Sequence, residues 1–218
     1  MYEKLDEIVK HAKHILVLQA DNPDGDSLGS ALALEAIFSE MGKQVSMVCA
    51  IDMPAHLRYL SGWDRVMKQV PQSFDATIIV DTSTETLFDN SKSNRGFEWI
   101  KTKPVVVIDH HVDSGGLSFA TVSLVEPVVA TSELIHSIAI ELGWPLPVDA
   151  CEMLATSIMS DSLGLTTTST TPSSFRVMAD LVERGVDLAK LDTARRELMK
   201  KEPKLIPYKG ALLQRVTF

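Results

Sequence analysis

The fold of this chain is decided by the stretch VVVIDHH at residues 105–111. Its first four residues are apolar and β-branched, which predicts a buried strand, and an acid and two histidines follow directly. Two other apolar runs end in the same way, because residues 15–19 lead into the acidic segment 21–26 and residues 76–80 lead into Asp81. Open α/β sheets bind ligands beyond the carboxyl ends of their strands. We therefore expect these polar side chains to share one site.

Strand patterns alternate with helical patterns along the whole chain. Strands are predicted at residues 15–19, 44–49, 76–80 and 105–108, with an extended edge segment within 117–125. Helices are predicted at residues 2–13, 27–41, 54–60, 130–142, 149–159, 172–183 and 187–201. This alternation predicts an α/β fold, with a mostly parallel sheet of about five strands and helices on both of its faces.

Composition restricts the class of protein. The chain has 218 residues, 45% of them hydrophobic, so it can form one large domain or two small ones. It lacks both an apolar run of the ~20 residues that span a bilayer and a signal-peptide pattern at its start. Cys49 and Cys151 lie in apolar stretches, which favours buried thiols in a reducing cytoplasm. The net charge of −8 argues against a long nucleic-acid groove but is compatible with a small phosphorylated substrate.

The motif Asp24-Gly25-Asp26 offers two carboxylates in one glycine-containing turn. Without a counter-charge the two acids would repel each other, and a divalent cation would remove that conflict. The alternative is that Asp26 only caps a helix that begins at Ser27. Both interpretations remain open from this motif alone.

The other strand and helix ends favour a metal. Asp81 alone could be an ordinary turn acid, but two successive histidines, His110 and His111, after a buried strand are typical of ligands. Asp161 ends an apolar helix, where the helix dipole disfavours an acid unless a cation faces it. An oxygen-rich set with some nitrogen suits manganese, with magnesium, cobalt or zinc as alternatives. Two such ions about 3.5–4 Å apart can activate a water and bind a phosphate.

These motifs together resemble the DHH family of phosphoesterases, in its branch of RecJ-like exonucleases, nanoRNases and pAp phosphatases. The resemblance runs from about residue 14 to about residue 185 and rests on four motifs: Asn22-Pro23-Asp24-Gly25-Asp26, Val80-Asp81, Asp109-His110-His111, and Ser160-Asp161-Ser162 with Thr170-Thr171 downstream. It implies a DHH catalytic domain over residues 1–186 and an interdomain helix and linker over residues 187–218. The family's C-terminal substrate-binding domain, with its Gly-rich, His-containing motif, is absent from this sequence.

The resemblance also implies roles for the matching residues. It implies five metal ligands: Asp24, Asp26, Asp81, His110 and Asp161. Asp24 would bind the first of two Mn²⁺ ions, and Asp81 would bridge the two. His111 and Asp81 would be the catalytic residues, with His111 at the scissile phosphate and Asp109 orienting the histidines. A metal-bound hydroxide would then hydrolyse a short oligonucleotide or a nucleotide such as pAp, with no membrane involved and a homodimer possible.

Two departures from the family pattern bear on activity. Ala20 stands where the first motif usually has a metal-binding histidine, and its neighbours Gln19 and Asp21 should point elsewhere. In the fourth motif, Gly164 lies one place late and Thr166 replaces a frequent arginine. The first metal site should therefore be weak. Because the family's usual covering domain is absent from this sequence, we also expect an open site with low activity. The alternatives are a catalytically weakened nucleotide- or metal-binding module, a cyclic-dinucleotide phosphodiesterase, a family II-type pyrophosphatase, or a structural protein without any metal.

Overall fold

A five-stranded sheet forms the centre of the fold. The structure is a computed structural model and describes residues 2–92, 96–113, 115–198, 203 and 205–215. The strands are β1 (His14–Leu18), β2 (Gln44–Val48), β3 (Ala76–Val80), β4 (Val105–Asp109) and β5 (Val122–Val125). They lie in the order β2-β1-β3-β4-β5, and every pair is parallel. The predicted α/β class with a parallel sheet is confirmed, and only the edge strand β5 is much shorter than the extended segment expected at 117–125.

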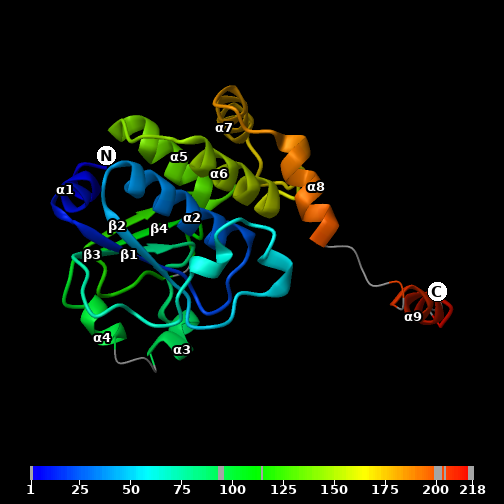
Figure 1. Ribbon diagram of the computed structural model, residues 1–218, viewed down its shortest axis with the longest axis horizontal. Coiled ribbons are helices and arrows are strands. Elements are labelled where there is room, and N and C mark those ends of the chain that lie inside the picture. Colours follow the sequence, from blue (N-terminus) through cyan, green and yellow to red (C-terminus); the bar gives the residue numbers. More distant parts are fainter. Residues whose placement is uncertain (1, 93–95, 114, 199–202, 204, 216–218) are drawn as a thin grey trace.

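Helices lie on both faces of this sheet, and α9 lies apart from it (Figure 1). They are α1 (Glu3–His11), α2 (Gly25–Glu40), α3 (Asp89–Lys92), α4 (Phe97–Ile100), α5 (Thr131–Leu142), α6 (Val148–Asp161), α7 (Pro172–Glu183), α8 (Leu188–Leu198) and α9 (Leu205–Leu213). The helix expected at 54–60 is only a 3₁₀ turn at Ala55–Leu57, and α9 was not expected. Residues 199–201 of the helix expected at 187–201, with 202, 204 and 216–218 of the linker, lie outside the described residues. Within the described parts of the chain, no helix combines the length and hydrophobicity that crossing a bilayer requires.

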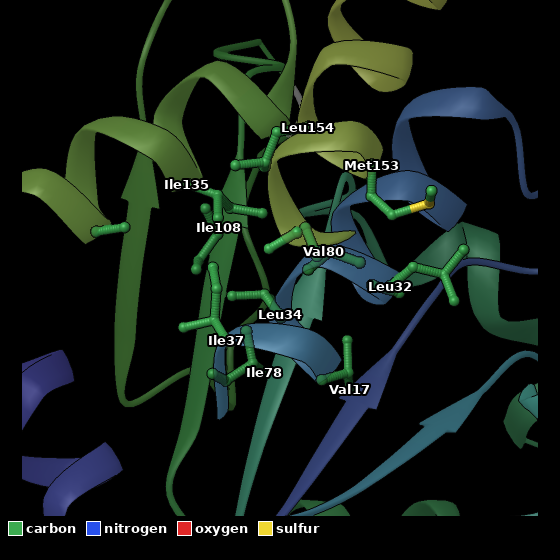
Figure 2. Close-up of a cluster of buried hydrophobic side chains, with 14 of the residues drawn as sticks. Val17, Leu32, Leu34, Ile37, Ile78, Val80, Ile108, Ile135, Met153 and Leu154 are labelled. Carbon is green, nitrogen blue, oxygen red and sulfur yellow. The ribbon is translucent and has the colours of Figure 1, made fainter. Parts of the chain in front are cut away.

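The alternation of side chains along each strand divides the core into two layers. Val17, Ile78 and Ile108 point to the face that α2, α5 and α6 cover, as Figure 2 shows. Leu16 and Val107 point to the opposite face, where the aromatic residues near α3 and α4 pack against them. A strand that is buried on both faces reads as a continuous apolar run, which is why these strands could be predicted from sequence.

Helices α2 and α6 pack unusually closely. A Cβ on Gly29 would overlap the hydroxyl of Ser157, and a Cβ on Gly25 would overlap the hydroxyl of Ser160. Only glycine allows two helices to approach at these points. This contact sets the first turn of α2 beside the last turn of α6, and it thereby fixes the relative position of the acids that these two turns carry.

Asp24, and not Asp26, caps α2. The Asp24 side chain accepts hydrogen bonds from the backbone N–H groups of Asp26 (3.0 Å) and Ser27 (2.9 Å). The interpretation of Asp26 as the cap was wrong because the helix begins at Gly25, two residues earlier than the pattern predicts. The capping residue must keep an extended backbone, and Asp24 does so with φ −126° and ψ −164°. Asp26 is consequently free to turn its carboxylate inward.

Candidate metal centre

Four segments bring acids and histidines together at the carboxyl edge of the sheet. They are the first turn of α2, the ends of β3 and β4, and the last turn of α6. The Nε2 atom of His110 lies 3.4 Å from Asp161 Oδ2, 3.5 Å from Asp81 Oδ1 and 4.0 Å from Asp26 Oδ2. The expectation that these strand ends share one location thus agrees with the geometry for Asp26, Asp81, His110 and Asp161.

His110 presents an unoccupied lone pair to the three acids. Its Nδ1 atom lies 3.2 Å from the carbonyl oxygen of Val128, and because a carbonyl can only accept, Nδ1 carries the proton. In the neutral ring Nε2 is then unprotonated, and it is buried without a hydrogen-bond partner in the described structure. A bare, buried imidazole nitrogen among carboxylates is the arrangement that a cation requires.

Two of the three acids, Asp26 and Asp81, are buried, and Asp161 is partly buried beside them. Among the described residues, no lysine or arginine forms an ion pair with these acids, and the basic side chains near them are His110 and His111. Burial raises the pKa of Asp26. Burial and the charges of Asp26 and Asp24 raise the pKa of Asp81 well above its usual range, and the same causes raise the pKa of Asp161 to about 7. A divalent cation would allow all three to ionise, so the residues present fit such an ion.

Thr131 holds two of these acids in place. Its backbone N–H donates to Asp26 Oδ2 (2.6 Å), and its hydroxyl donates to Asp81 Oδ1 (3.0 Å). The N–H of Ser132 donates to the other oxygen of Asp26 (3.2 Å). Both donors stand at the start of α5, where N–H groups lack partners within the helix. Sequence reasoning missed Thr131, because a threonine at a helix start signals capping but does not identify a distant acceptor.

Asp109 orients one of the two histidines. Its Oδ1 lies 2.7 Å from His111 Nδ1 and also accepts the backbone N–H groups of His110 and His111, and Ser83 donates its hydroxyl to Oδ2 (2.7 Å). Burial alone would raise the pKa of Asp109, but the hydrogen bonds from His111, Ser83 and the backbone lower it. The hydrogen bond to Asp109 raises the pKa of His111. His110 is instead oriented by Val128, a difference from the role expected for Asp109.

Among the described residues, the position expected for a first metal has no comparable group of neighbouring ligand atoms. Asp24 belongs to neither group of neighbouring ligand atoms, which are Asp81 with His110 and His111, and Asp26 with His110 and Asp161. It lines a small cavity of about 180 Å³ that also contains Ala20, Asp81 and His111.

Neither neighbour of Ala20 replaces the missing histidine. The carboxylate of Asp21 accepts the N–H groups of Asn90 and Ser91 and the hydroxyl of Ser91, so it faces α3. Gln19 is completely buried, and its amide has no hydrogen-bond partner in the described structure. The expectation that Asp21 would point elsewhere agrees with this geometry, and for Gln19 it stays a prediction.

Comparison with known proteins places these motifs in one family. The family model described as "DHH family, N-terminal domain" matches residues 14–161. The chain is 28% identical to the bifunctional oligoribonuclease and PAP phosphatase NrnA of Thermus thermophilus over 90% of this chain and 57% of that protein. It is 27% identical to a probable manganese-dependent inorganic pyrophosphatase of Streptococcus agalactiae over 80% of this chain and 57% of that protein. The chain therefore spans little more than half the length of these relatives.

A solved structure has the same fold. The exopolyphosphatase-related protein from Bacteroides fragilis superposes with a TM-score of 0.86 at 18% identity, over 99% of this chain and 65% of that one. At 18% identity, this structural similarity supports the fold alone. It agrees with the parallel five-stranded sheet described above.

Proposed function

This chain belongs to the DHH family, and from that membership we propose that it is a metal-dependent phosphoesterase that hydrolyses a nucleotide or a short oligonucleotide. The observation that carries the proposal is the bare Nε2 atom of His110, buried within 4.0 Å of the carboxylates of Asp26, Asp81 and Asp161. The proposed metal ligands are these four residues, with Asp24 as a weaker ligand of a second ion. When bound, Mn²⁺ would activate a water and polarise the phosphate.

The protein's own contribution is to position the ligands and to supply a proton. Thr131 fixes Asp26 and Asp81 through its N–H and hydroxyl, so little reorganisation is needed during the reaction. His111 has its Nδ1 on Asp109, and its ring lines two cavities beside the acids. The hydrogen bond to Asp109 raises the pKa of His111, and when the ring is protonated its Nε2 can donate a proton or hydrogen bond to the leaving oxygen.

The substrate class and the domain division belong to the same proposal. One relative is named an oligoribonuclease and PAP phosphatase and another a pyrophosphatase, and we favour the nucleotide class. Residues 1–186 would form the catalytic unit, because the candidate ligands lie between Asp24 and Asp161 and the family model ends at residue 161. Residues 187–218 would form the interdomain helix and linker.

Turnover with manganese tests the proposal. We expect Mn²⁺-dependent release of mononucleotide or phosphate from a dinucleotide or from pAp. His110→Ala should lower kcat by about 100-fold or more, because it removes a proposed metal ligand. Asp75→Asn, at the opposite edge of the sheet, is the matched control and should retain activity. Manganese binding without hydrolysis of a dinucleotide, pAp or a cyclic dinucleotide would contradict the assignment as a phosphoesterase.

A binding module without turnover is the second candidate. Ala20 is buried where the family has a histidine, and Asp24 lies outside both ligand groups. Ala20→His should therefore increase the number of bound Mn²⁺ ions from one toward two, as measured by calorimetry, and increase kcat about tenfold or more if the chain is a weakened enzyme. A second bound ion without any gain in turnover would favour the binding module.

A further inference from the structure

A large groove opens beside the candidate metal centre. It has a volume of about 720 Å³, and His110, His111 and Asp161 line its inner end. This volume lies within the range of small-molecule sites, ~300–1,000 Å³. A phosphate at the metal centre would therefore have space beside it for the rest of its molecule. We call this space the outer groove.

The residues that line the outer groove are of two kinds. One group is apolar and consists of Val112, Pro127, Val128 and Val129. The other group, which we call the hydroxyl segment, consists of Thr168, Ser169 and Thr171. Among the described residues that line the groove, none is a lysine or arginine, and the carboxylates are those of Asp113 and Asp161.

Hydrogen bonds order the turn that leads into the hydroxyl segment. Ser162 is buried, its Oγ accepts the N–H of Leu165 (2.7 Å), and its carbonyl accepts the N–H groups of Thr166 (2.8 Å) and Thr167 (3.1 Å). The Thr167 hydroxyl lies 3.1 Å from that of Ser169. These bonds fix the turn at residues 162–167, directly before the hydroxyl segment, and the Thr167 hydroxyl holds that of Ser169.

Two leucines at the start of this loop have left-handed backbones. Leu163 has φ 50° and Leu165 has φ 66°, a conformation that is costly for such residues. Leu163 is also largely exposed, so it gains little by burial. Backbone strain persists where surrounding interactions hold the chain in the strained conformation. Here the hydrogen bonds to Ser162 hold the loop in that conformation.

The described lining of the outer groove has no lysine or arginine to bind further phosphate groups. A pyrophosphate or polyphosphate chain that extended past the metal centre and His111 would place its additional negative charges beside Asp113, with no lysine or arginine of the described lining to offset them. A nucleoside is neutral, one face of its base or sugar is apolar, and its hydroxyl groups both donate and accept hydrogen bonds. That pattern complements a lining that combines apolar residues with residues that carry hydroxyl groups.

We propose that the outer groove is a nucleoside subsite, in which Thr168 and Ser169 bind the sugar or base of a phosphoester whose phosphate lies at the metal centre. It would select nucleotides over inorganic pyrophosphate. This inference rests on the proposed function for the location of the phosphate, but it concerns binding and can be tested without turnover.

Calorimetry on the manganese-loaded chain tests the subsite, with adenosine 5′-monophosphate and inorganic phosphate as probes. The variant Thr168→Ala/Ser169→Ala removes two exposed hydroxyl groups and should fold normally. We expect it to weaken nucleotide binding about tenfold, the effect of one or two lost hydrogen bonds, and to leave phosphate binding unchanged. Thr166→Ala is the matched control, because its hydroxyl bonds to the Leu163 carbonyl and does not line the groove.

Several results would overturn the subsite. They are no binding of the nucleotide by the wild type, equal weakening of both probes in the double variant, an unchanged nucleotide affinity, or tighter binding of pyrophosphate than of the nucleotide. Failure of the proposed function would be seen in a different measurement. A chain that never hydrolyses a phosphoester can still bind the nucleotide in preference to phosphate through these hydroxyl groups. An active chain without that preference would keep the function and lose the subsite.

Discussion

At the scale of single residues, two features of Asp81 lower the stability of the fold. It has a left-handed backbone with φ 60°, which is uncommon for a residue other than glycine. Its carboxylate is buried near that of Asp26, with no lysine or arginine ion-paired to it among the described residues. Such costs are retained at functional sites, where a ligand offsets them.

Asp81→Asn should therefore stabilise the metal-free protein. Asparagine keeps the size, tolerates the left-handed backbone and can still accept the Thr131 hydroxyl, but it removes a buried charge. We expect a rise in Tm of about 2–4 °C, which corresponds to ~1 kcal/mol at this chain length. Calorimetry in a chelator measures it, and the same variant should lose the rise in Tm that Mn²⁺ gives the wild type. A lower Tm in chelator would contradict this account.

Asp75→Asn is the control, and it should lower the stability of the protein instead of raising it. The Asp75 carboxylate is exposed and accepts the N–H groups of Lys13 (2.8 Å) and His14 (2.9 Å), and these bonds lower its pKa. A lowered pKa contributes stability above the unfolded value of about 3.9 and loses it as pH falls further. The variant should be slightly less stable at pH 7, by well under ~1 kcal/mol because of solvent screening. The difference should shrink as pH falls below ~3.9 and through the lowered pKa of Asp75, and Mn²⁺ binding should not change.

The two cysteines should be unreactive in the folded chain. Cys49 and Cys151 are free and buried, and burial raises the pKa of each thiol to about 11. At pH 8 only ~0.1% of each would be thiolate, the reactive form. We expect less than ~0.1 thiol per chain to react with a disulfide reagent before unfolding and both to react afterwards. Rapid reaction of either one in the native protein would show an opening that the fold does not indicate.

Much of the site could be predicted at this scale because its residues follow recognisable strand ends. Asp81 and His110 end apolar runs, and a parallel sheet brings such ends together. The cap of α2 could not be predicted, because the apolar pattern places a helix start only to within a few residues. Thr131 could not be predicted either, since its two acceptors come from distant segments and only the tertiary fold brings them to α5.

At the scale of elements, the contact between α2 and α6 controls the spacing of the site. The buried strands and the amphipathic helices followed from their periodicity, whereas this contact depends on the small residues Gly29 and Ser157, which carry little pattern. The edge strand β5 and helix α9 were also poorly predicted. β5 is only partly buried and α9 has no buried residue among those described, so neither shows the continuous or periodic burial on which prediction depends.

Gly29→Ala should destabilise the protein by about 1–3 kcal/mol, the usual cost of overpacking. Its new methyl would meet the Ser157 hydroxyl, and Ser157→Ala in the same chain should recover part of the loss. Chemical denaturation measures both effects. Gly210→Ala is the control, because that glycine lies in α9 with open space around it, and it should leave the main transition unchanged. Equal stability of Gly29→Ala and the wild type would refute the close contact.

At the scale of the whole molecule, the two edges of the sheet carry acids in different settings. The acids of the proposed metal centre lie at the carboxyl edge. At the amino edge, the exposed Asp75 carboxylate connects the starts of β1 and β3. A metal at the carboxyl edge would connect α2, β3, β4 and α6 at once. Binding to the folded state alone stabilises it, by ~2.7 kcal/mol at 100 times Kd.

Hydrogen exchange with and without Mn²⁺ tests this connection. Local opening at loop edges needs less free energy than global unfolding, so the ion should slow exchange first where its ligands lie. We expect slower exchange at residues 24–30, 79–83, 108–113 and 157–163 together, and unchanged exchange in α1 and α8, which hold none of the proposed ligands. Asp81→Asn should abolish the effect at all four segments. Protection of one segment alone would mean that the ion binds a surface acid, because a centre assembled from four segments must protect them all.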